Sequence, residues 1–388
     1  MTTDKHGSAP APSHLNQWRS IGRILLKTAV LLLLFNIIFA ALYPMEALGD
    51  ITLYNWLLRG RERLPYGENP AESYNLSTFN MPAMFASHRL QQPKAADEFR
   101  VLLIGDSGTW GWFLENEDTL TAQLNEMGLE DENGRSVHVY NLGYPVMALT
   151  KDIMLLEEGM AYDPDLILWP VTLESFPRDK QLFPPLVQNN PKRVRQLITD
   201  YDLDLDAQDG RFVDPTFLDS TIFGQRRNLA DLLRLQAYGV SWAATGIDQA
   251  IPADIPERTS DFDADLSWQT FPEPATLTTA DLAFDVLNAG MAIAGDVPIL
   301  LINEPMFISS GQNSDLRYNA FYPRWAYDQF REMLGETAVA QNWHYLDLWN
   351  TIPPEQFTDT PVHLTPEGTR LYAEHISKAL QSFLKIED

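Results

Sequence analysis

A long apolar run near the N-terminus is the feature that most restricts how this chain can fold. Residues 28–45 carry no charged side chain, and residues 24–26 extend the run past Lys27. A helix that crosses a bilayer needs about 20 apolar residues, with a range of about 17–25. We therefore predict a transmembrane helix over residues 24–45. A cleaved signal peptide is the main alternative, and the small residues 40–41 are the only hint of a cleavage site.

Charge is divided unequally between the two sides of this run. The residues before it include four bases and one acid, whereas the whole chain has a formal charge of −25. The bases are Lys5, Arg19, Arg23 and Lys27, and the acid is Asp4. Basic flanks stay in the cytoplasm. The prediction is a single-pass protein of the cell membrane, with residues 1–23 as a cytoplasmic tail and the acidic remainder outside.

Composition also excludes several classes of function. The acidic balance argues against nucleic acid as a partner, because binding phosphates needs a basic face. The chain has no cysteine, which excludes disulfides, thiolate metal sites and a cysteine nucleophile. The histidines show no metal-ligand spacing, and the sequence has no phosphate-binding loop, so we predict no metal and no cofactor.

The rest of the chain divides into an irregular lead-in and a large α/β domain. Residues 46–97 are rich in Pro, Asn and Ser. They predict a juxtamembrane segment that wraps the domain or spaces it from the bilayer, and its aromatic part, residues 47–58, could lie along the membrane surface. In residues 98–388, short apolar runs alternate with helical patterns, which is typical of a parallel sheet covered on both faces. The predicted fold class is a three-layer α/β/α sandwich with a mainly parallel, flavodoxin-like central sheet.

The individual elements follow from these patterns. The expected strands are residues 101–104, 137–141, 165–169, 298–303 and 343–348. The expected helices are residues 152–160, 279–294 and 327–341, and a last helix that Thr365 caps.

Residues 180–278 interrupt the alternation and are predicted to be an insertion that caps the sheet edge, with helices over 192–200 and 227–238. Trp242 and Trp268 are expected to be packing residues. A second membrane contact through residues 237–251 is disfavoured, because that stretch is too short to span and contains Asp248.

Two short blocks contain the residues best suited to chemistry. Ser107 lies in the segment Gly105–Gly111 (GDSGTWG), directly after an expected buried strand. A serine in such a tight turn exposes its hydroxyl, and nearby backbone amides point to where an oxyanion would form. The second block, Asp359–Gly368 (DTPVHLTPEG), places His363 just before the last helix. A histidine there can take the serine proton while a carboxylate orients it.

These blocks resemble the SGNH/GDSL superfamily of esterases and acyltransferases. The resemblance covers about residues 98–180 and 280–388. It implies that Ser107 is the nucleophile and supplies one backbone N–H to the oxyanion hole, and that Gly143, after the second strand, supplies another. His363 would be the general base, oriented by Asp359.

The chain departs from the family pattern at two places. The family usually has its aspartate three residues before the histidine, whereas Asp359 lies four residues before His363, so Asp347 is a second candidate for the orienting carboxylate. The family also has an Asn after the third strand, and here the chain reads Trp169–Ser175 (WPVTLES). Thr172 and Asn303 are candidate replacement donors, and Glu174 is a candidate occupant of the site.

The resulting hypothesis is a membrane-anchored serine esterase or O-acyltransferase. It would act on an ester, such as that of a cell-envelope glycan, through an acyl-enzyme on Ser107. The alternative hypothesis is an inactive protein of the same fold that binds a glycan or a protein partner. The altered Asn and Asp–His positions motivate it.

Overall fold

The computed structural model describes residues 14–67, 69 and 72–384, and it divides into two compact units. The first unit consists of the described residues up to Met45 together with Pro215–Ala230. Its main element is helix α1 (His14–Leu42), of which Gln17–Leu42 is apolar and long enough to cross a membrane. Length and composition alone fit a single-pass anchor or a signal sequence.

The bounds of α1 differ from the prediction at both ends. The helix includes residues 14–23, which were predicted to be part of the tail, and it ends at Leu42 rather than at residue 45. It stops because Tyr43 has a positive φ of 40° and Pro44 cannot continue the helix. The polar side chain of Asn36 donates to the carbonyl of Leu32 at 2.9 Å, so its amide is satisfied within the apolar helix.

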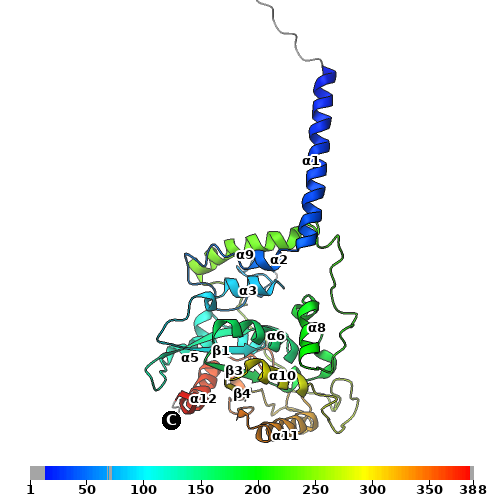
Figure 1. Ribbon diagram of the computed structural model, residues 1–388. Coiled ribbons are helices and arrows are strands. Elements are labelled where there is room, and N and C mark those ends of the chain that lie inside the picture. Colours follow the sequence, from blue (N-terminus) through cyan, green and yellow to red (C-terminus); the bar gives the residue numbers. More distant parts are fainter. Residues whose placement is uncertain (1–13, 68, 70–71, 385–388) are drawn as a thin grey trace, which may run out of the picture. The chain divides into compact units, whose positions relative to one another are not determined.

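The second unit, Glu46–Asp214 with Asp231–Asp388, is built on a five-stranded sheet (Figure 1). The strands are β1 (Glu98–Gly105), β2 (Ser136–Gly143), β3 (Leu166–Val171), β4 (Ile299–Asn303) and β5 (His344–Asp347). They run parallel in the order β2-β1-β3-β4-β5. The predicted fold class is confirmed, because each of the five expected strands overlaps one of these.

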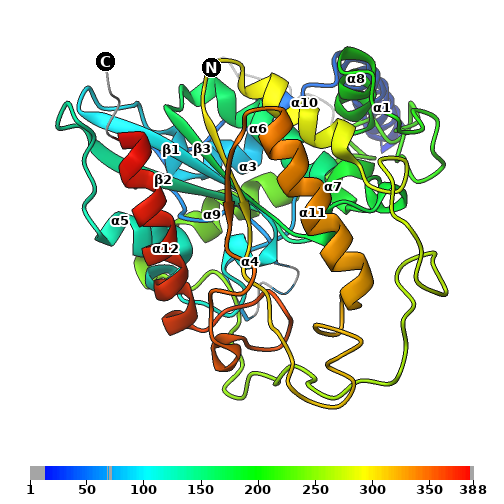
Figure 2. The same cartoon turned by 90° about the horizontal axis from the view of Figure 1, so that it is seen from below.

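Helices cover both faces of the sheet (Figure 2). On one side lie α6 (Leu149–Gly159), α10 (Phe284–Ala294) and α11 (Arg324–Ala340), and on the other lie α5 (Leu120–Glu126) and α12 (Pro366–Leu384). Within β1, Leu102 and Ile104 pack in the hydrophobic core that includes α6, α10 and α11. Val101 and Leu103 pack in the core on the other face, which includes α5 and α12. This alternation explains why the strand is apolar at every position. Thr365 caps α12 as expected, since its Oγ1 accepts the N–H of Gly368 at 3.0 Å.

The lead-in wraps the sheet domain and contributes to its core. It contains α2 (Met45–Gly49) and α3 (Met81–Ser87), and Leu64, Phe85 and Leu90 are fully buried in the same core as α6 and α10. Of the two roles predicted for this segment, the structure shows the wrapping role.

The insertion holds α7 (Pro185–Gln188), α8 (Pro191–Asp200) and α9 (Arg226–Thr245). Its Gln249 accepts the N–H of Phe113 at 2.9 Å and donates to the carbonyl of Gly111 at 2.8 Å. Farther along, Arg258 donates to the carbonyl of Phe357 at 2.7 Å. The insertion therefore contacts the loop after Ser107 and the loop before Asp359. Trp242 and Trp268 are buried, as expected for packing residues.

A buried ion pair connects the lead-in to the insertion. Arg63 and Asp248 are each about 1% exposed, and the Arg63 Nε donates to the Asp248 carboxylate at 3.0 Å. Arg63 also donates to the carbonyls of Gly111 and Leu114 at 2.9 and 3.0 Å. Removing one partner of such a pair leaves a buried charge uncompensated. We expect Arg63→Met to lower the free energy of unfolding by about 3–5 kcal/mol, measured by denaturant titration of the full chain.

The control for this prediction is the double variant Arg63→Met/Asp248→Asn. It removes both charges, so its loss of stability should be clearly smaller than the sum of the two single losses. Additive losses in this cycle would contradict the ion pair.

His88 makes the stability of the second unit sensitive to acid. Its Nδ1 accepts the N–H of Leu90 at 3.1 Å, and its Nε2 donates to the carbonyl of Glu62 at 3.0 Å, which defines the neutral ring. Burial lowers the pKa of His88 from 6.5 to about 3, so the folded protein resists the proton that the unfolded chain accepts. The free energy of unfolding should therefore fall by up to about 1.4 kcal/mol per pH unit as the pH drops from 6.5 toward 3. We expect His88→Gln to have a shallower fall in melting temperature over this range, and equal slopes would contradict the assignment.

Candidate active site

Ser107 begins a short helix at the carboxyl edge of the sheet. The strand β1 ends at Gly105, and Asp106 then caps α4 (Ser107–Trp110) by accepting the N–H of Gly108 at 2.8 Å and that of Thr109 at 3.4 Å. An aspartate is among the best residues for such a cap. Gly111 ends the helix with a φ of 92°, a conformation that a glycine adopts without strain. This local sequence holds the Ser107 side chain in a fixed turn.

His363 lies in the tight loop that leads into α12. The loop is closed by the Thr358 N–H, which donates to the His363 carbonyl at 2.8 Å, and by the His363 N–H, which donates to Thr360 Oγ1 at 3.2 Å. The loop also packs against α4, because a Cβ added at Gly108 would lie 3.0 Å from the Val362 carbonyl. The His363 side chain is 8% exposed.

The structure brings Ser107, His363 and Asp359 together in one chain of hydrogen bonds. Ser107 Oγ lies 2.8 Å from His363 Nε2, and His363 Nδ1 lies 2.8 Å from Asp359 Oδ1. Burial acts to raise the pKa of Asp359, but the hydrogen bond and charge of His363 outweigh it, and the pKa lies below its usual 3.8. The ionised carboxylate accepts Nδ1–H, which leaves Nε2 free to accept the Ser107 proton. The separation of four residues between Asp359 and His363 therefore still allows this hydrogen bond.

The structure places Asp347 and Asn303 in a different network. Asp347 accepts the Asn303 amide at 2.9 Å and the Arg331 Nε at 2.7 Å. Asn303 is fully buried, and its Oδ1 accepts the hydroxyl of Tyr327 at 3.1 Å. Asp347 therefore does not orient His363. The Asn303 amide donates to Asp347 in the core. This arrangement does not agree with the expectation that Asn303 serves as an oxyanion donor.

Gly143 occupies its expected place at the end of β2, beside Gly105. A Cβ there would lie 2.5 Å from the Trp110 nitrogen, so only glycine lets β2 approach α4 this closely. The Gly143 N–H, however, donates to the side chain of Asn141 at 3.0 Å. The amide expected in the oxyanion hole is therefore occupied in this conformation.

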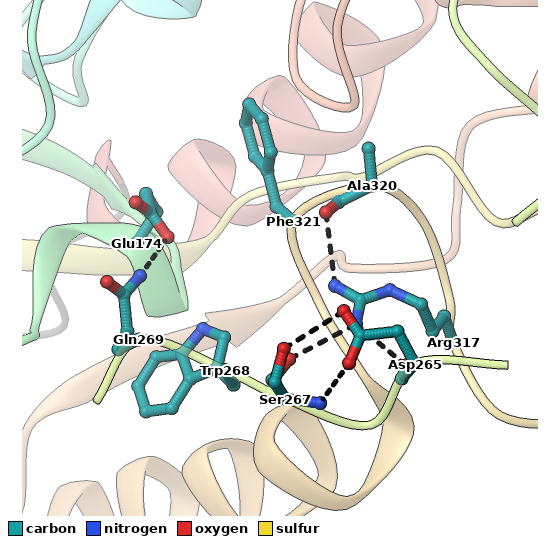
Figure 3. Close-up of a pocket in the computed structure, with 8 residues that line it drawn as sticks. All are labelled: Glu174, Asp265, Ser267, Trp268, Gln269, Arg317, Ala320 and Phe321. Atoms are coloured by element: carbon teal, nitrogen blue, oxygen red, sulfur yellow. Dashed lines mark hydrogen bonds between the residues drawn. The ribbon is translucent and has the colours of Figure 1, made fainter. Parts of the chain in front are cut away.

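Thr172 and Glu174 follow β3 and are tied to other side chains. Thr172 is fully buried, and its Oγ1 lies 3.0 Å from the hydroxyl of Tyr322. Glu174 pairs with Lys180 and accepts the amide of Gln269 at 3.0 Å. It lines a cavity of about 250 Å³ (Figure 3). Among the described residues, neither Thr172 nor Glu174 forms a hydrogen bond or an ion pair with Ser107 or His363, so the structure does not bring them into the same site.

Two aromatic residues beside the site, Trp112 and Tyr66, were not identified from the sequence. Trp112 stacks on the His363 ring with centroids 6.1 Å apart and planes at 26°, and Tyr66 of the lead-in lies edge-on to Trp112 at 5.9 Å. The Trp follows Gly111 directly, but its contact with a histidine about 250 residues later depends on the tertiary fold.

Lys151 was also not identified from the sequence. It is fully buried on α6, where it pairs with Asp152 and donates to the carbonyls of Gly105 and Tyr144. These carbonyls flank the ends of β1 and β2, so one ammonium group ties together the two strand ends at the candidate site. A buried Glu304 contributes to the same electrostatic environment. Burial, and then the charges of Asp106 and Asp152, raise its pKa well above 4.5.

Comparisons with known proteins give only distant similarities. No protein-family model and no curated protein matches this chain. Among solved structures, a carbohydrate acetylesterase family member from Sinorhizobium meliloti is 13% identical, with a TM-score of 0.33 over 74% of this chain and 98% of that one. A protein from Desulfitobacterium hafniense assigned to the lipolytic G-D-S-L family is 14% identical, with a TM-score of 0.32 over 72% and 98%.

A catalytic mutant of the acetylxylan esterase Axe2 from Geobacillus stearothermophilus is 13% identical, with a TM-score of 0.36 over 74% and 97%. These identities and scores are low. They assign no role to Ser107, His363 or Asp359.

Proposed function

We propose that this protein is a serine esterase or O-acyltransferase of the SGNH/GDSL type. The observation that carries the proposal is the unbroken hydrogen-bonded chain Ser107–His363–Asp359, with both contacts at 2.8 Å. A serine becomes nucleophilic when a histidine base accepts its proton and a carboxylate holds that histidine in the correct tautomer. The motif resemblance described from the sequence points to the same chemistry.

The mechanism has two half-reactions. In the first, His363 Nε2 removes the Ser107 proton as Oγ attacks the ester carbonyl carbon. The tetrahedral intermediate then collapses, the ester C–O bond breaks, and the leaving alcohol takes the proton from His363. In the second, His363 deprotonates a water or an acceptor hydroxyl, which attacks the acyl carbon. The bond to Ser107 Oγ then breaks, His363 returns the proton to Oγ, and the acyl group leaves on the new oxygen. Water gives hydrolysis, and a sugar hydroxyl gives acyl transfer.

The oxyanion hole is the weakest part of the machinery. Asp106 already accepts the N–H groups of Gly108 and Thr109, so the Ser107 N–H is the amide left at the start of α4. The Gly143 N–H would join it only by leaving Asn141. Loss of one such donor typically costs about 10²–10³ in rate. We therefore propose a slow enzyme unless substrate binding turns the Asn141 side chain away from Gly143.

The setting suggests the class of substrate. If α1 remains as an anchor, the basic residues at its start favour an N-terminus in the cytoplasm and a catalytic unit outside the membrane. An ester on a cell-envelope glycan would be within reach of such a unit.

The experiment that tests the proposal is labelling of the full chain with a fluorophosphonate. This reagent reports an activated serine without requiring the natural substrate. We expect the wild-type protein to be labelled, and we expect Ser107→Ala and His363→Ala to lose the label. Ser382→Ala, on the exposed end of α12, is the matched control and should be labelled like the wild type.

The second candidate is an inactive protein that binds a glycan or a protein partner. The occupied Gly143 amide and the absent Asn favour it. It predicts that a folded wild-type protein gives no label, and that glycan binding is unchanged by Ser107→Ala.

A further inference from the structure

Two segments of the second unit that are far apart in sequence lie side by side. The N–H of Leu53 donates to the Gln236 side chain of α9 at 2.6 Å. The ring of Tyr54 packs against Gly239, where an added Cβ would come within 2.4 Å of it. Residues 51–57 therefore lie along α9, at the margin of this unit in Figure 1.

Helix α9 is apolar on two opposite faces. Leu235, Gly239 and Trp242 are buried against the domain. The residues that point the opposite way are exposed and equally apolar: Leu233, Ala237, Val240 and Ala244. Their spacing of four, three and four residues places them on one stripe of the helix. Leu233 is 74% exposed, whereas a soluble surface helix normally has charged and polar residues at such positions.

The neighbouring segment extends the apolar surface. Ile51, Leu53, Trp56 and Leu57 are all exposed, and Trp56 and Leu57 are 77% and 87% exposed. Tryptophan is enriched where a protein meets the boundary between lipid headgroups and acyl chains. We call the exposed residues of 51–57 and the stripe of α9 the apolar patch. An exposed apolar surface of this kind marks an interaction site.

Charge favours a lipid bilayer as the partner. The whole chain has a formal charge of −25, yet Arg59 is the only charged residue in 51–60 and Arg234 the only one in 233–247. Arg234 pairs with Asp231, so the patch is nearly neutral in a strongly acidic protein and can approach the phosphates of a membrane surface with little repulsion. Chain connectivity agrees, because segment 51–57 follows α1 after only the short stretch 43–50.

We propose that the apolar patch inserts into the headgroup region of the membrane, with α9 lying in the plane of the interface. An interfacial helix of this kind buries its apolar face about 5–10 Å into the boundary layer. The stretch 237–251 is too short to span, but a surface helix needs no spanning length. The contact fixes how the sheet domain faces the membrane, and it does not depend on the chemistry of Ser107.

The absence of cysteine allows a site-specific test on the full chain. Single cysteines are introduced as Val240→Cys and Leu57→Cys in the patch, and as Val339→Cys on α11, where the side chain is 84% exposed. Each protein is labelled with an environment-sensitive fluorophore and reconstituted into liposomes of phosphatidylcholine and phosphatidylglycerol. Lipids that carry a spin-label quencher on the acyl chain then report contact with the bilayer.

We expect a blue shift and several-fold stronger quenching at positions 57 and 240 than at position 339. Adding Ala237→Glu to the Val240→Cys protein should reduce the quenching, while its circular dichroism stays unchanged. Quenching at position 240 no stronger than at position 339 would overturn the proposal. A blue shift at position 240 that is already present in detergent and grows with protein concentration would also overturn it, because that result identifies a second copy of the chain as the occupant.

Discussion

Ser107→Ala is expected to lower the turnover of an activated acetyl ester, such as p-nitrophenyl acetate, by about 10⁴–10⁶-fold. Without the hydroxyl, His363 has no proton to accept at 2.8 Å, and no acyl-enzyme can form. The residual rate would come from the remaining amide donors and from substrate binding. The measurement is the initial rate of full-length protein in detergent, with folding checked by circular dichroism.

The rate of the double variant is the more discriminating part of this prediction. When catalytic residues act as one unit, the first substitution already removes most of the rate enhancement that they provide together. We therefore expect Ser107→Ala/His363→Ala to be little worse than Ser107→Ala alone. An unchanged rate in Ser107→Ala would exclude the acyl-enzyme, and multiplying losses in the double variant would exclude a coupled pair.

Asp359→Asn is expected to lower kcat by about 10³–10⁴-fold with little change in folding stability. The carboxylate accepts Nδ1–H of His363 at 2.8 Å, and the lowered pKa of Asp359 keeps it ionised at neutral pH. An amide at this position can donate to Nδ1, which would move the ring proton to Nε2 and block it as a base. The measurement is kcat and KM separately, since only the reacting step should suffer.

Asp347→Asn is the matched control for this prediction. Asp347 is also an aspartate at the carboxyl edge of the sheet, but it pairs with Asn303 and Arg331. We expect its kcat to stay within a few-fold of the wild type. If Asp347→Asn abolished activity and Asp359→Asn did not, the orienting carboxylate would have to be reassigned.

The expected α/β elements followed from short-range patterns. The apolar runs at 101–104 and 166–169 are typical of strands buried on both faces, and they lie in β1 and β3. The Thr365–Pro366 start of the last helix is equally local, because the cap bonds form within one turn. Helix lengths were less accurate. The helix α9 runs seven residues past its predicted end at 238, because the stripe at Val240 and Ala244 continues the helix without a stop signal.

The candidate donors show where short-range patterns stop being sufficient. Gly143, Asn303 and Thr172 were plausible oxyanion donors by position, yet their polar groups bond to Asn141, Asp347 and Tyr322. Asn141 lies two residues before Gly143 on the same strand, whereas Asp347 and Tyr322 belong to other parts of the fold. The position of a residue in the sequence does not show which partner its buried polar group will meet.

By itself, the sequence determined the apolar helix and the pattern of strands. It also determined that Ser107 lies in a turn just after a strand and His363 in a loop just before a helix. These features depend on neighbours within a few residues, so local sterics and hydrophobic periodicity define them. Only the tertiary structure decided that Asp359 reaches His363, that Trp112 stacks on it, and that residues 51–57 lie along α9. Such contacts join segments that are distant in the sequence. They form because close packing of the two hydrophobic cores against the sheet fixes the positions of the loops that connect its strands and helices.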